Sequence, residues 1–118
     1  MKYFNKDTRN TIQSIEYAQY IAFAPVVFQA AKALRDFGLL KMANEAGKRG
    51  ITCKEAARKS GISLYGVRVL FEAGLGIGLL ILSKDRFMIT GTGKFILNDN
   101  MTTVNMDFVN DVCYKGMF

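Results

Sequence analysis

Residues 48–63 read K-R-G-I-T-C-K-E-A-A-R-K-S-G-I-S, and this stretch decides the fold. Thr52, with Glu55 three residues later, has the spacing of a capping box, in which each side chain bonds to the backbone N–H of the other residue. The pattern predicts a short helix over residues 53–59. Gly61 then predicts a left-handed helix end, because glycine adopts a positive φ without steric cost.

A second helix is predicted directly after this one. Ser63 is a favourable N-cap, and residues 64–73, L-Y-G-V-R-V-L-F-E-A, place apolar side chains at helical spacing. The stripe that we expect to be buried consists of Leu64, Val67, Leu70 and Phe71. Two short helices joined by the turn S-G-I-S form a helix-turn-helix pattern.

The residues that follow predict a β-hairpin. Two apolar runs, residues 79–83 and residues 87–90, flank the polar turn K-D-R at residues 84–86. This is the pattern of two antiparallel strands joined by a short connection. Thr90 or Thr92 can then cap a further short helix.

Helical spacing also appears on both sides of this region. Residues 8–23 predict a first helix. Pro25 either ends this helix or starts the next one. Residues 26–38 predict a second helix and residues 39–46 a short third one. The stripes expected on one helical face are Val27, Ala30 or Ala31, Leu34 and Phe37 in the second helix, and Val104, Phe108, Val109, Val112 and Cys113 near the C-terminus.

This order of elements predicts a mainly α fold: a winged helix-turn-helix with one small β-hairpin and flanking N- and C-terminal helices. A length of 118 residues suits one domain with one core. We expect an N-terminal helical arm at about residues 1–24, a winged-helix core at residues 25–97 and a C-terminal helix at residues 100–118.

Residues 72–80, E-A-G-L-G-I-G-L-L, have the composition of a loop that cradles a phosphate or an adenosyl cofactor. Such a loop follows a strand and opens a helix, whose free N–H groups face the ligand. Here the order is reversed, because a helix precedes the glycines and a strand follows them. We therefore expect Gly74 or Gly76 to end the helix in a left-handed conformation, with Leu75 and Ile77 packed on the core.

The composition argues against several classes of protein. The chain has no histidine, which removes the commonest general base and metal ligand, and its ten acidic residues show no metal-binding spacing. Cys53 and Cys113 are two thiols without CxxC spacing. The longest apolar run, residues 74–82, is too short to cross a membrane. We expect a soluble cytoplasmic chain that has no catalytic or metal-binding residues of its own.

The net charge of +6 is concentrated in residues 32–94, which alone carry +7. In a winged-helix DNA-binding protein, Tyr65 and Arg68 would contact bases, while Lys84 and Arg86 would contact phosphates. The candidate recognition helix offers few side chains that read base edges. The alternative is that these charges are simply solvated.

Two stretches of the chain resemble the N-terminal winged-helix domain of bacterial class I S-adenosylmethionine-dependent methyltransferases, relatives of the small-molecule O-methyltransferases. They are S-L-Y-G-V-R-V-L-F-E-A-G-L-G-I-G-L-L at residues 63–80 and K-D-R-F-M-I-T-G-T-G-K-F-I-L-N-D at residues 84–99. The tail at residues 105–118 is similar to the segment that leads toward the catalytic domain in that family. The resemblance covers roughly residues 26–118.

The resemblance implies a domain that dimerises, often by exchanging or interleaving helices, and that roofs the substrate pocket of a separate methyltransferase domain. S-adenosylmethionine and a small-molecule methyl acceptor would bind in that separate domain. Its glycine-rich loop has no counterpart in this chain, so the resemblance assigns no catalytic or cofactor-binding residue here.

The leading hypothesis is therefore a non-catalytic dimerisation and substrate-lid domain whose partner is a second copy of the chain. The predicted interface residues are Tyr3, Phe4, Ile12, Ile15, Tyr20, Phe23, Phe108, Val109 and Val112. The alternative for these residues is an ordinary monomer core. The alternative function is a DNA-binding transcriptional regulator.

Overall fold

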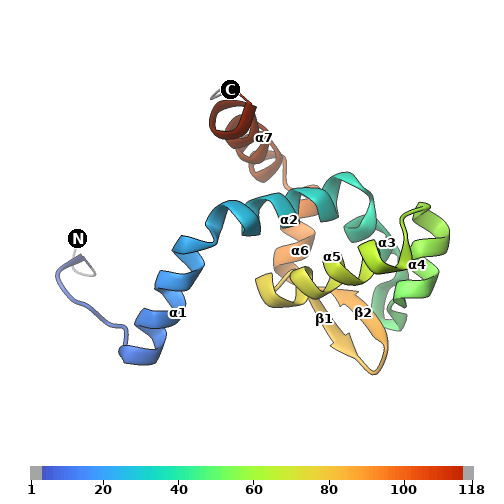
Figure 1. Cartoon of the computed structure of the whole chain (residues 1–118), viewed down its shortest axis with the longest axis horizontal. Coiled ribbons are helices and arrows are strands. Elements are labelled where there is room, and N and C mark those ends of the chain that lie inside the picture. Colours follow the sequence, from blue (N-terminus) through green and yellow to red (C-terminus); the bar gives the residue numbers. More distant parts are fainter. Residues whose placement is uncertain (1–3, 116–118) are drawn as a thin grey trace.

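The computed structural model describes residues 4–115, and in it two helical segments, one near each end of the chain, project from a winged-helix core (Figure 1). The elements in chain order are α1 (Thr11–Ala22), α2 (Ala24–Asp36), α3 (Leu39–Ala46), the 3₁₀ turn η2 (Gly47–Arg49), α4 (Cys53–Ser60), α5 (Leu64–Ile77), β1 (Leu80–Ser83), β2 (Arg86–Ile89), α6 (Gly91–Asn98), α7 (Asn100–Val109) and the π-helical segment η3 (Asn110–Lys115). The predicted class, a mainly α winged helix with one small hairpin, is confirmed.

The caps around the helix-turn-helix form at the predicted residues, although only the Thr52 half of the predicted capping box does. The Thr52 hydroxyl accepts a hydrogen bond from the N–H of Glu55 at 3.1 Å, and Gly61 ends α4 with a φ of 76°. Ser63 caps α5 in the same way. The Glu55 carboxylate, however, forms an ion pair with Arg86 at 3.3 Å. The two side chains therefore link α4 to the hairpin.

The hairpin turn is one residue shorter than the sequence suggested. Ser83 pairs with Arg86 across the two strands, so Arg86 is the first residue of β2 and not part of the turn. The turn consists of Lys84 and Asp85, and Lys84 has a φ of 59°. A left-handed residue suits a two-residue hairpin loop, whose twist must match that of the strands.

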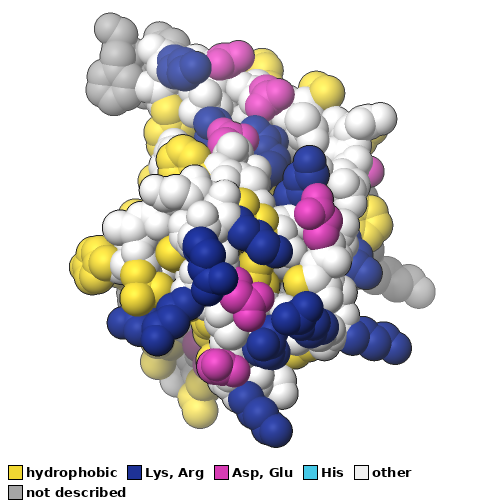
Figure 2. All heavy atoms as spheres, turned by 90° about the vertical axis from the view of Figure 1, so that its right-hand side faces the viewer, with side chains coloured by type: hydrophobic (Ala, Val, Ile, Leu, Met, Phe, Trp, Pro, Cys, Tyr) yellow, Lys and Arg dark blue, Asp and Glu magenta, His cyan; other side chains and the backbone are white. Residues whose placement is uncertain are grey.

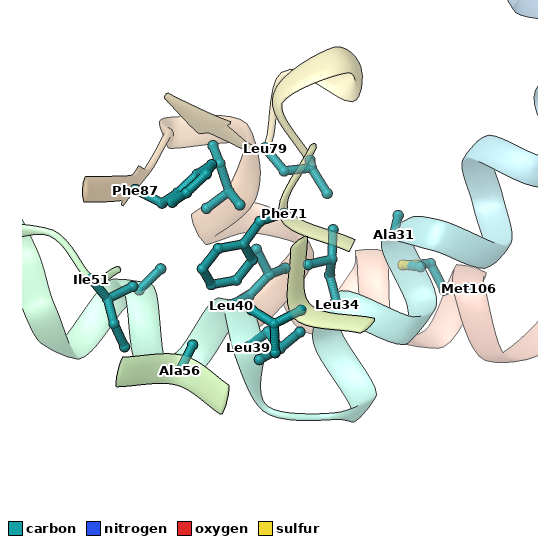
Figure 3. Close-up of a cluster of buried hydrophobic side chains, with 13 residues drawn as sticks. Ala31, Leu34, Leu39, Leu40, Ile51, Ala56, Phe71, Leu79, Phe87 and Met106 are labelled. Atoms are coloured by element: carbon teal, nitrogen blue, oxygen red, sulfur yellow. The ribbon is translucent and has the colours of Figure 1, made fainter. Parts of the chain in front are cut away.

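The core lies between the helix-turn-helix, α2, α3 and the hairpin (Figure 3). Its centre is the ring of Phe71, which packs against Phe87 with centroids 4.7 Å apart. Ile51 extends the hairpin by exchanging two backbone hydrogen bonds with Phe87. The buried side chains are Ala31, Leu34, Leu39, Leu40, Ala43, Ile51, Ala56, Val67, Phe71, Leu79, Leu80, Phe87 and Met106.

Phe37 does not continue the buried stripe of α2, as the sequence suggested. It follows the last residue of the helix, and its side chain is 58% exposed. Residues beyond a helix end no longer follow the helical periodicity that the stripe assumes. Ala31 and Leu34 carry the buried part of the stripe instead.

The prediction that Gly74 or Gly76 ends the helix is wrong. The helix α5 continues through both glycines and ends at Gly78, which has a φ of 93°. Gly74 is needed for packing, because a Cβ there would meet Leu80 Cδ1 at 2.8 Å and Leu34 Cδ1 at 3.2 Å. The glycine thus lets α2 and β1 approach the helix closely.

Two alanine substitutions in this helix should have opposite effects. We expect Gly74→Ala to destabilise the fold by about 1–3 kcal/mol, because the new methyl group overpacks the contact with Leu80. A Cβ at Gly76 has no atom within 4 Å, so Gly76→Ala should stabilise by about 0.5–1 kcal/mol through helix propensity. Urea unfolding of both variants measures the difference, and equal midpoints would contradict the packing role.

Thr90 joins the hairpin to α6 and confirms one of the two predicted caps. Its hydroxyl accepts from the N–H of Gly93 at 3.1 Å and donates to the carbonyl of Gly78 at 2.7 Å. Its backbone N–H donates to the carbonyl of Leu79 at 3.0 Å. The start of α6 is therefore held against the end of α5.

Candidate dimerisation surface

The helix α1 is an apolar arm with no buried residue along its whole length, Thr11–Ala22. It extends away from the winged-helix core and, among the described elements, packs on the start of α2 (Figure 1). The radius of gyration is 16.0 Å, whereas a compact chain of this length has about 13.5 Å. The large exposed apolar side chains of α1 and of its C-cap residue are Ile12, Ile15, Tyr17, Tyr20, Ile21 and Phe23.

The start of α1 is well specified by local bonds. Asn10 Oδ1 accepts from the N–H of Gln13 at 2.8 Å, and Gln13 Oε1 accepts from the N–H of Asn10 at 3.0 Å. This is a reciprocal capping box, and the Arg9 guanidinium lies 4.0 Å from the centre of the Tyr17 ring. A helix of this length is nevertheless marginal in water without tertiary packing. Within the described residues α1 has little such packing, since none of its residues is buried.

The second exposed apolar face belongs to α7 and η3. Asp99 caps α7 by accepting hydrogen bonds from the N–H and the hydroxyl of Thr102, and these bonds lower the pKa of Asp99. Met106 is the buried residue of the helix. Met101, Val104, Phe108 and Val112 are exposed.

Contacts with α2 hold this C-terminal helix in place. The Arg35 guanidinium lies 3.2 Å from an Asp107 oxygen and 3.8 Å from the Met106 sulfur. Burial opposes the charged form of Arg35, but its hydrogen bonds to Asp36 and Asp107 raise the pKa of Arg35 overall. The ring of Tyr114 stacks on Phe28 with centroids 5.3 Å apart. These contacts use one face of the helix and leave the apolar face free.

The structure places the predicted interface residues on these two faces. Ile12, Ile15 and Tyr20 lie on α1 and Phe23 directly follows it, whereas Phe4 precedes the helix in the chain; each of the five is more than half exposed. Phe108 and Val112 are exposed on the C-terminal helix, and Val109 is half-buried. Tyr3 lies outside the described residues. Their role in an interface stays a prediction.

The sequence reasoning missed other exposed apolar residues on the same faces. Tyr17 and Ile21 are exposed on α1, Val26 is exposed near the start of α2, and Met101 is 72% exposed on α7. The missed signal is that the large apolar residues of α1 are not confined to one stripe, whereas a helix on a protein surface has one apolar stripe.

The four residues of the DNA-binding hypothesis are placed unequally. Tyr65 is 78% exposed, and Arg68 and Lys84 are also exposed, on α5 and on the hairpin turn. The Arg86 guanidinium already has partners within the fold, since it pairs with Glu55 and donates to the carbonyl of Gly50 at 3.3 Å. DNA binding by these residues stays a prediction.

The glycine-rich stretch lies in the last turns of α5 and at its end. A helix end presents carbonyl oxygens, whereas phosphate loops present N–H groups. Within residues 4–115, His, Cys, Asp and Glu form no group that could hold a metal ion. None of the helices described is long and apolar enough to cross a membrane.

A winged-helix core with exposed apolar side chains on two helices is typical of a domain that associates with another protein surface. Residues 16–87 match the model of the Dimerisation2-like domain family, which is more than half of the chain, and the chain belongs to this family. The family is the N-terminal dimerisation domain of O-methyltransferase-like enzymes. A search of curated proteins found no match.

Proposed function

We propose that the chain forms a homodimer through α1 and α7 and serves as the dimerisation and substrate-lid domain of an S-adenosylmethionine-dependent methyltransferase. Catalysis and cofactor binding would take place in a separate domain. The observation that carries the proposal is the arm α1, which exposes large apolar side chains along its length and has no buried residue within the described fold. Membership of a dimerisation family supports it.

The free energies of burial support a dimer in which the apolar side chains of both α1 and α7 are covered. Ile12, Ile15, Ile21 and Phe23 are 57–68% exposed, so covering each would gain about 1–2 kcal/mol. Two arms would then supply about 8–16 kcal/mol, while association costs about 4–15 kcal/mol in lost freedom of motion. The arms alone therefore give a narrow margin, and the apolar face of α7 widens it.

Sedimentation equilibrium tests the proposal. We expect a mass of twice the 13.2 kDa of one chain at micromolar concentration, because an isologous interface buries both faces in both copies. The chain alone should not bind S-adenosylmethionine in calorimetry. A monomer at high micromolar concentration would overturn the dimer, and saturable cofactor binding would overturn the separate catalytic domain.

A further inference from the structure

A pocket of about 500 Å³ lies between α4, α5 and the hairpin, on elements other than α1 and α7. Leu82, which is 48% exposed, and the small exposed part of Phe87, which is 6% exposed, provide apolar surface in its lining. Cys53 adds to this surface. Burial raises the pKa of the Cys53 thiol. Arg68 lowers this pKa and Glu72 raises it, both to a smaller extent, so the thiol is neutral near pH 7.

Four cationic side chains surround this apolar lining. They are Lys54, Arg58, Arg68 and Lys84. Figure 2 shows Lys and Arg side chains gathered over the lower half of the face that carries α3 and α4, with apolar atoms and a few acidic side chains among them. Such a combination of apolar lining and positive charge is typical of a site for an amphipathic anion.

These charges are not neutralised by the fold. Among the described residues, the ion pairs within 4.0 Å involve Lys32, Arg35 and Arg86, and none of the four pocket cations. The Glu55 carboxylate also lines the pocket but is paired with Arg86. Asp85 is the other carboxylate in the lining. The pocket therefore retains a positive potential.

The outer face of α5 argues for a small ligand over duplex DNA. Tyr65, Val69 and Glu72 are exposed there beside Arg68, and of these four side chains Arg68 alone is a donor to guanine, while none is a bidentate reader of adenine. The cations instead converge on a hollow with an apolar lining, which suits a small molecule.

We propose that this pocket binds an organic anion with an apolar body, such as a carboxylate or a phosphate on a hydrocarbon chain. The anionic group pairs with Arg68, whose planar guanidinium suits a two-oxygen anion, with Lys84 nearby in the same lining. The hydrocarbon body covers Leu82 and the exposed part of Phe87. The site goes beyond the proposed dimerisation function, because its residues lie outside the two apolar helices.

NMR titration of the intact chain with octanoate tests the proposal. We expect saturable shifts of the backbone amides of Cys53, Lys54 and Leu82. Arg68→Ala should weaken octanoate binding about tenfold or more, because it removes a charge-assisted hydrogen bond. Lys41→Ala is the matched control, since Lys41 is exposed on α3 and does not line the pocket.

Three comparisons make the outcome decisive. Octanamide, which lacks the charge, and inorganic phosphate, which lacks the apolar body, should each bind at least about tenfold more weakly than octanoate. A DNA duplex of similar concentration should give no shifts at Tyr65 or Arg68 at physiological salt. Equal binding of octanamide, tighter binding of phosphate or of the duplex, or unchanged affinity in Arg68→Ala would overturn the proposal. None of these results depends on the oligomeric state.

Discussion

Replacing Ile15 with glutamate is expected to convert the dimer into a monomer while the winged-helix core stays folded. Ile15 is 57% exposed in the single chain and lies on an arm without buried residues. In the proposed interface the new carboxylate would be buried without a partner, twice by symmetry, and each copy costs several kcal/mol. We expect dimer affinity to fall at least about 100-fold, measured by sedimentation velocity.

Ile81→Glu is the matched control. Ile81 is 54% exposed on β1, so the substitution and the exposure are alike, but the residue lies outside α1 and α7. This variant should remain a dimer, and circular dichroism should show helical content in both variants. An Ile15→Glu variant that still dimerises, or an Ile81→Glu variant that does not, would place the interface elsewhere.

The largest loss of stability is expected for Gly93→Ala. A Cβ at this position would lie 2.4 Å from the backbone carbonyl oxygen of Leu79 and 2.7 Å from Ile89 Cγ1. A backbone atom cannot move aside as a side-chain end can, so α6 must shift away from the hairpin. We expect a loss of about 2–4 kcal/mol, a large part of the about 5–15 kcal/mol that a domain has.

Gly91→Ala provides the comparison within the same helix. A Cβ at Gly91 has no atom within 4 Å, and alanine favours the helix, so the variant should be neutral or stabilised by up to about 1 kcal/mol. Urea unfolding followed by circular dichroism measures both variants. If Gly93→Ala unfolds at the same urea concentration as Gly91→Ala, the close contact between α6 and Leu79 is not as described.

The sequence predicts those parts of the fold that depend on neighbouring residues. Thr52 and Ser63 cap their helices, Gly61 adopts a left-handed conformation, and Thr90 begins α6. Each of these features needs a side chain and a backbone group within three residues of one another, or one backbone conformation. The order of helices and hairpin follows from them.

Features that depend on distant residues could not be predicted in this way. Gly74 looks like a helix terminator, but it is required by Leu34 and Leu80, which approach it from other elements. Arg86 looks like a free cation of the wing, but it pairs with Glu55, 31 residues earlier in the chain. Spacing along the chain does not show which elements meet.

The candidate site shows the same limit. Apolar residues at helical spacing in α1 predict a helix with an apolar surface, whether that surface covers its own core or a partner. The structure separates the two cases for Met106, which is buried, and for Ile12 and Phe108, which are exposed. Neither the helical spacing nor the exposure of these side chains identifies the partner. That the partner is a second copy of the chain is the central claim of the proposal.

An isotope-filtered NOE experiment on a mixture of labelled and unlabelled chains tests the proposed homodimer most directly. We predict intermolecular contacts from the methyl groups of Ile12 and Ile15 on the arm, and from Val104 on α7, to the unlabelled copy. Ile81, on the wing, should show none. Intermolecular contacts absent from both helices, or confined to Ile81, would contradict the proposed dimer.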